Sequence, residues 1–117
     1  MKINDLLIGV LSFVIAHILT FFQLNGQFLW ESFKKNEIAV AAAGFILSFF
    51  YLWGTKYTVA GMGGLLWPTR FIGFATGIII YAIMVSYFFK EGITSKTLVS
   101  LILAVILICV QVLWKTS

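Results

Sequence analysis

Charged residues are spaced so widely along this chain that four long stretches contain none. These stretches hold 25, 18, 19 and 18 residues, and they lie between Asp5 and Glu31, Glu37 and Lys56, Arg70 and Lys90, and Lys96 and Lys115. A helix needs about 20 predominantly apolar residues to cross about 30 Å of hydrocarbon. Charged residues make up 10% of the chain, against about 25% in a soluble domain. The sequence therefore predicts a membrane protein and excludes a soluble enzyme.

Four membrane-spanning helices account for nearly the whole sequence. Helices satisfy their own backbone hydrogen bonds in lipid, whereas the strands of a membrane barrel would need an alternation of apolar and polar residues that residues 98–110 lack. We predict an all-α, four-transmembrane-helix bundle that forms a single membrane domain over residues 1–117. The predicted helices cover residues 5–28, 37–56, 64–89 and 96–115. The protein would then be a multi-pass integral membrane protein, which we place in the cell inner membrane, surrounded by the lipid bilayer.

The distribution of charge excludes several classes of function. The net charge is +4, but the basic residues are scattered at the ends of the spans, where lysine and arginine reach the lipid headgroups. We therefore expect no nucleic-acid partner. The four acidic residues, Asp5, Glu31, Glu37 and Glu91, also lie at span ends. Since the chain has one histidine and one cysteine, the sequence offers no metal site and no nucleophile triad, and we expect neither a cofactor nor an enzymatic activity.

Polar and small residues gather on one side of each predicted helix when positions are counted at 100° per residue. The first helix carries Gln23 and Gln27 on this side, and the third carries Trp67, Arg70 and Tyr81 together with two glycines four residues apart. Small residues at this spacing allow helices to pack closely, so the stripes have a purely structural interpretation. Glutamine and arginine are costly in lipid, however, and normally face protein or a water-filled cavity. We expect a cavity lined by some of these side chains.

Arg70 has two interpretations that depend on where the third helix begins. If the helix begins at Thr69, Pro68 occupies a position that tolerates proline, and Arg70 is an anchor at the membrane interface. If it begins near Gly64, Arg70 lies about two turns inside the helix, where its charge would need an anionic partner. The sequence leaves both alternatives open.

His17 is the only histidine, and it lies in the middle of the first predicted helix. Because an unperturbed histidine titrates near pH 6.5, this residue is a candidate for proton coupling and for contact with a substrate. A neutral imidazole that is hydrogen-bonded to a neighbouring helix is the structural alternative.

Several short segments resemble the small multidrug resistance proteins and, more broadly, the drug/metabolite transporter superfamily. The matching segments are Tyr51-Leu52-Trp53 and Lys56-Tyr57 at the end of the second helix, Trp67 and Gly73 in the third, and residues 88–94 before the fourth. The resemblance implies a four-helix transporter with Trp67 in its binding cavity. The family's glutamate in the first helix, which binds protons and substrate, has no counterpart here, because His17 is the only ionisable residue in that part of the helix.

The basic residues are balanced between the two sides of the membrane. One side would carry Lys2, Lys56, Arg70 and Lys115, and the other would carry Lys34, Lys35, Lys90 and Lys96. Because an excess of lysine and arginine normally sets orientation, this chain has little bias and could insert both ways. We therefore expect an antiparallel homodimer, the arrangement that the resemblance to the small multidrug resistance proteins implies. A cavity in so small a protomer also favours an oligomer.

These observations together predict a small membrane transporter that moves a small polar or anionic solute by alternating access. The predicted substrate-binding residues are Trp67, Arg70, Tyr81, Gln23, Gln27 and His17. The alternative hypothesis is a non-transporting membrane subunit or assembly factor, whose polar stripes would pack against a larger partner.

Overall fold

The computed structural model describes residues 2–114, and this part of the chain contains helices and short connections but no strand. The helices are α1 (Ile3–Asn25), the 3-10 helix η1 (Gly26–Phe28), α2 (Glu31–Lys35), α3 (Glu37–Ala42), α4 (Gly44–Gly61), α5 (Leu66–Phe88) and α6 (Ser95–Leu113). Four helical segments, Ile3–Phe28, Glu37–Gly61, Leu66–Phe88 and Ser95–Leu113, are long and apolar enough to cross a membrane. The prediction of an all-α chain with four such helices is confirmed. Lys115, the predicted end of the last helix, lies outside the described residues.

The second span differs most from its predicted range of 37–56. It is interrupted at Ala43, between α3 and α4, and α4 continues to Gly61. The helix ends in a Schellman motif, in which the Gly64 N–H donates to the Val59 carbonyl at 2.8 Å and Gly63 has a φ of +71°. Lys56 was predicted as the end of this helix but lies within α4. A lysine can occupy such a position because its ammonium group stays exposed on the helix surface.

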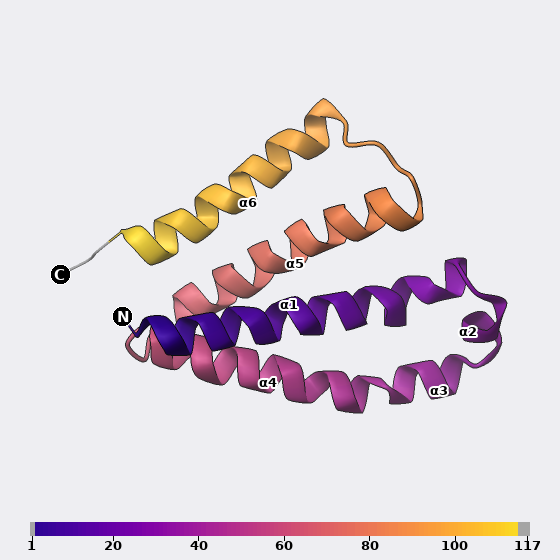
Figure 1. Cartoon of the computed structure of the whole chain (residues 1–117), viewed down its shortest axis with the longest axis horizontal. Helices are drawn as coiled ribbons and strands as arrows, with labels where there is room; N and C mark the ends of the chain where they lie inside the picture. Colours follow the sequence, from indigo (N-terminus) through magenta and orange to yellow (C-terminus); the bar gives the residue numbers. More distant parts are fainter. Residues whose placement is uncertain (1, 115–117) are drawn as a thin grey trace.

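The four long helices lie in a row in the order α4, α1, α5, α6, and the chain reverses direction at each connection (Figure 1). The N-terminus, the α4–α5 connection and the C-terminal end of α6 therefore lie at the same end of the row (Figure 1). The row is thin, with extents of 52 × 36 × 18 Å. Most of the large apolar side chains are consequently exposed on its faces, as in a protein that lipid surrounds.

Glycines allow α1 and α4 to pack most closely. A Cβ atom at Gly9 of α1 would lie 2.5 Å from the Thr58 nitrogen, and a Cβ atom at Gly61 of α4 would lie 2.6 Å from the Leu6 nitrogen. The Lys2 N–H also donates to the Gly61 carbonyl at 2.9 Å, which ties the start of α1 to the end of α4. Small residues at a helix contact are the ordinary means of close approach in a membrane bundle.

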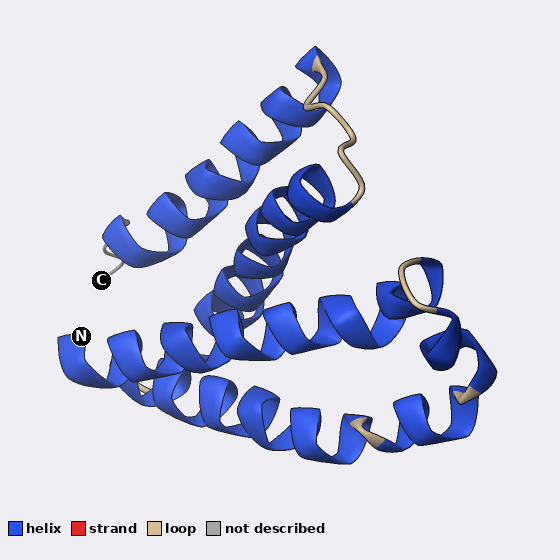
Figure 2. Ribbon diagram, turned by 45° about the vertical axis from the view of Figure 1, so that its right-hand side comes forward, coloured by secondary structure: helices blue, strands red, loops and turns tan. Residues whose placement is uncertain are grey.

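The other side of α1 packs against α5, and α6 occupies the edge of the row beside α5 (Figure 2). Phe21 of α1 joins this contact to the end of α5, with its ring centroid 5.7 Å from that of Tyr81 and 6.1 Å from that of Phe88. Ala104 is the only residue of α6 that is buried. The packed centre of the molecule is thus formed by α1, α4 and α5.

Candidate functional site

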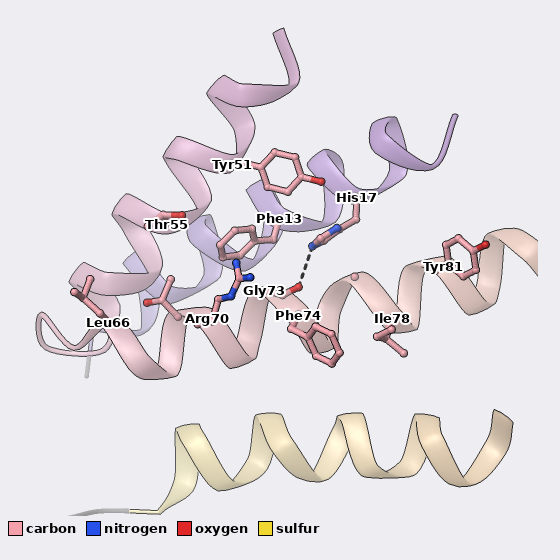
Figure 3. Close-up of a pocket in the computed structure, with 12 residues that line it drawn as sticks. Phe13, His17, Tyr51, Thr55, Leu66, Arg70, Gly73, Phe74, Ile78 and Tyr81 are labelled. Carbon is pink, nitrogen blue, oxygen red and sulfur yellow. Dashed lines mark hydrogen bonds between the residues drawn. The ribbon is translucent and has the colours of Figure 1, made fainter. Parts of the chain in front are cut away.

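A cavity of about 750 Å³ lies between α1, α4 and α5 (Figure 3). Its lining residues are Phe13, His17, Tyr51, Thr55, Leu66, Thr69, Arg70, Gly73, Phe74, Gly77, Ile78 and Tyr81. None of them belongs to α6, and the cavity is partly open at its outer side. The volume falls within the range of small-molecule sites, and a lining that is mostly apolar with a few polar groups is typical of them.

Among residues 2–114, Arg70 is the only charged residue that lines this cavity. Since α5 begins at Leu66, Arg70 is the fifth residue of the helix and lies about 6 Å along its axis. Pro68 belongs to the first turn, where a backbone N–H would have no partner within the helix. The helix therefore begins at Leu66, between Gly64 and Thr69, the two starting positions that the sequence allowed.

The guanidinium group of Arg70 extends from α5 toward the ring of Phe13 (Figure 3). The ion pair found within residues 2–114 joins Lys35 to Glu31 and does not involve Arg70. Arg70 is exposed rather than buried in the protomer. The cavity thus contains a positive charge that no carboxylate of the described chain neutralises.

His17 lies deeper along the cavity, at the contact between α1 and α5. Its Nε2 atom is 2.9 Å from the carbonyl oxygen of Gly73 (Figure 3). Because a carbonyl only accepts, Nε2 is the atom that carries the hydrogen and Nδ1 is left as the acceptor of a neutral ring. A Cβ atom at Gly77 would lie 2.8 Å from Cε1 of His17, so Gly77 leaves the space that the imidazole occupies. This hydrogen bond joins His17 to a neighbouring helix, as expected if the residue has a structural role.

Two tyrosines line different parts of the cavity. The Tyr51 hydroxyl is 2.6 Å from the Thr20 hydroxyl, and its ring lies edge-on to His17 with 5.5 Å between centroids. Tyr81 is 51% exposed, and its hydroxyl has no hydrogen-bond partner among the described residues. Tyr81 can therefore offer a hydroxyl to a ligand, whereas the hydroxyl of Tyr51 is already engaged.

Arg70, Tyr81 and His17 are the three predicted site residues that the structure brings to one cavity. Gln23 and Gln27 do not line it. The Gln23 side chain donates to the Val40 carbonyl at 3.2 Å, next to the interruption between α3 and α4. The Gln27 side chain is exposed and donates to the Leu24 carbonyl within its own turn, at 2.9 Å.

Trp67 also lies outside the cavity. It is 73% exposed and lines a separate hollow of about 840 Å³ between the start of α5 and the end of α6, together with Gln111 and Trp114. Its ring stacks on Phe71 with 6.0 Å between centroids. Trp67 lies about 100° around the helix from Leu66, which lines the cavity, and Trp67 faces the end of α6 instead.

Sequence reasoning did not assign a binding role to Phe13, Tyr51, Thr55 or Phe74. Tyr51 and Thr55 share one side of their helix and follow the polar pattern of the sequence, which is a signal that could have included them. Phe13 and Phe74 are two of 12 phenylalanines, and no local pattern separates them from those that face lipid.

No known protein family, curated protein or solved structure matches this chain. The similarity to small multidrug resistance proteins therefore stays a prediction, and the chemistry of the site must be inferred from its own residues. No three histidine, cysteine, aspartate or glutamate side chains lie together as a metal site within residues 2–114. The arrangement of one cation, one imidazole and several aromatic rings is suited to binding a solute.

Proposed function

We propose that this protein is a small membrane transporter that moves a small polar or anionic solute by alternating access. The observation that carries the proposal is the position of Arg70, whose charge faces a cavity between membrane-spanning helices without an acidic partner among the described residues. A charged side chain that faces a cavity between such helices normally marks a pathway for ions or substrate. An anionic solute would supply the missing negative charge.

We further propose that two copies of the chain form the transporting unit. The cavity is lined by three helices and is partly open on its outer side, so a second protomer would close it and would provide a surface for alternating access. The balanced lysine and arginine residues at the two sides are compatible with copies inserted in opposite directions, which would make the unit an antiparallel homodimer in the cell inner membrane.

The experiment is an uptake measurement with the full chain in proteoliposomes. The probes are gluconate as a polar anion, naphthalene-1-sulfonate as an aromatic anion that stays charged, and choline as a cation. We expect uptake of at least one of the two anions, and we expect Arg70→Gln to reduce it at least tenfold. Lys96→Gln removes the same charge at an exposed site far from the cavity and should behave as the parent. Uptake of neither anion, or equal uptake with Arg70→Gln, would contradict the proposal.

One observation favours the second candidate function, a non-transporting subunit or assembly factor. The helix α6 packs chiefly against α5, and all but one of its residues are exposed or half-buried. A larger membrane partner could cover this helix. Purification in a mild detergent distinguishes the candidates, since a homodimer free of other chains supports the transporter and obligatory co-purification of a different chain supports the subunit.

A further inference from the structure

The charge of the cavity limits the charge of its ligand. Arg70 is the single charged residue in the lining, so one negative charge on a ligand would be neutralised and a second would have no partner. A second charge against the mostly apolar lining would lose hydration without gaining a partner, which is unfavourable. The planar guanidinium group also matches a carboxylate, with which it can form two parallel hydrogen bonds. A cationic ligand would be repelled.

Three of the six polar side chains that line the cavity already form hydrogen bonds within the protein. The Tyr51 hydroxyl is paired with Thr20, and the Nε2 atom of His17 is paired with the Gly73 carbonyl. The Thr69 hydroxyl donates to a backbone carbonyl of its own helix at 3.4 Å. The Arg70 guanidinium, the hydroxyls of Thr55 and Tyr81, and the Nδ1 atom of His17 are left for a ligand. Once Arg70 holds an anionic group, the other three are fewer than the hydroxyls of a sugar or sugar acid, which would stay partly unsatisfied here.

The remaining surface of the cavity is apolar and rich in rings. Phe13, Tyr51, Phe74 and Tyr81 supply four aromatic side chains from three helices. Arg70 and Tyr81 lie 11 positions apart on α5, which places them about 16 Å apart along the helix axis. A ligand held at Arg70 therefore has room for an extended flat body that can stack between rings.

We propose that the cavity binds an aromatic monocarboxylate, with the carboxylate on Arg70 and the ring system among Phe13, Tyr51 and Tyr81. The proposal narrows the substrate of the transporter proposed above, and it rests on that function only for the way in which the ligand reaches the site. It excludes dianions, polyhydroxylated acids and lipophilic cations as preferred ligands.

Calorimetric titration of the purified full chain in detergent tests this assignment with a matched set of probes. The probes are 1-naphthoate, cyclohexanecarboxylate, gluconate, succinate, inorganic phosphate and 1-naphthylmethylammonium. We expect 1-naphthoate to bind at least tenfold more tightly than each of the others. Tighter or equal binding of succinate, phosphate, gluconate or the ammonium probe would overturn the proposal.

Variants separate the two parts of the site. Arg70→Gln should weaken 1-naphthoate at least tenfold, Arg70→Lys should retain part of the affinity, and Lys96→Gln should leave it unchanged. Tyr81→Leu should reduce the preference for 1-naphthoate over cyclohexanecarboxylate while the affinity for cyclohexanecarboxylate stays the same. If Arg70→Gln binds 1-naphthoate like the parent, the assignment is wrong.

The outcomes also distinguish this inference from the proposed function. Binding of 1-naphthoate that depends on Arg70, without uptake of either gluconate or naphthalene-1-sulfonate by proteoliposomes, would keep the ligand assignment and refute transport. Uptake of gluconate that depends on Arg70, without binding of 1-naphthoate, would keep transport and refute the ligand assignment.

Discussion

The close contact between α1 and α4 gives a quantitative prediction for Gly9→Ala. The added Cβ atom would lie 2.5 Å from the Thr58 nitrogen and 3.0 Å from the Gly54 oxygen. Ordinary contacts between such atoms are about 3.5 to 4.0 Å. Both neighbours are backbone atoms that cannot rotate away, so the two helices would have to separate by about 1 Å along their contact.

The size of the effect follows from two opposing contributions. Overpacking of a well-packed contact costs about 1 to 3 kcal/mol. The higher helix propensity of alanine offsets up to about 1 kcal/mol of this cost. Because both clashing neighbours are backbone atoms, the cost should lie at about 2 to 3 kcal/mol. After the offset of up to about 1 kcal/mol, we expect Gly9→Ala to lower the free energy of unfolding by about 1 to 3 kcal/mol.

The assay is reversible unfolding of the purified protein in mixed detergent and dodecyl sulfate micelles, followed by circular dichroism. Gly92→Ala is the matched control, because a Cβ atom at Gly92 meets nothing within 4 Å and its φ is not positive. Its effect should lie between no change and a gain of about 1 kcal/mol. A Gly9→Ala variant as stable as the parent would refute the close α1–α4 contact.

The remaining predictions concern buried polar groups in the packed centre. The Thr58 hydroxyl is fully buried without a partner, so Thr58→Val should leave the free energy of unfolding unchanged or raise it by about 1 kcal/mol; a loss above about 1 kcal/mol would show that the hydroxyl has a partner. Gly77→Ala places a Cβ atom 2.8 Å from Cε1 of His17, so the imidazole should leave its hydrogen bond and its ¹⁵N resonances should shift; unshifted resonances would contradict this contact. A double-mutant cycle of Thr20→Val and Tyr51→Phe should give a coupling energy of about 0.6 kcal/mol in the same unfolding assay, typical of hydrogen bonds between membrane helices, and additive effects would argue against their hydrogen bond.

The existence of the four helices could be predicted because long uncharged stretches are sufficient to specify them. Their ends were harder to predict, since Lys56 suggested a boundary although a lysine on a helix surface can remain solvated. The observed end of α4 depends on the positive φ of Gly63 and on the hydrogen bond that the Gly64 N–H donates to the Val59 carbonyl. The glycine pair was visible in the sequence, but its place in a Schellman motif was not recognised.

The candidate site was predictable only in part, because helical periodicity gives the side of a helix but not its neighbours. It placed Arg70 and Tyr81 on a common side, and the structure has both in one cavity. The same periodicity included Trp67, which lines another hollow because the end of α6 lies beside it, and the sequence pattern does not give that neighbour. Gln23 was expected to face a cavity, yet an interruption in the neighbouring helix exposes a backbone carbonyl that its amide reaches.

The most direct test of the charge that Arg70 brings to the cavity is the reactivity of a cysteine placed across the cavity on α4. Thr55 lines the cavity on α4 and is exposed, so Thr55→Cys in a Cys109→Ser background can be modified by anionic and cationic methanethiosulfonate reagents. If Arg70 faces the cavity, the ratio of the anionic to the cationic rate should fall about tenfold when Arg70→Gln is added, as expected for unit charges about 6 Å apart in a water-like dielectric, where the charge changes the barrier for each reagent by about 0.7 kcal/mol. Ser32→Cys, outside the cavity on α2, should show no change. An unchanged ratio at Thr55→Cys would contradict the central claim that Arg70 presents its charge to a ligand in this cavity.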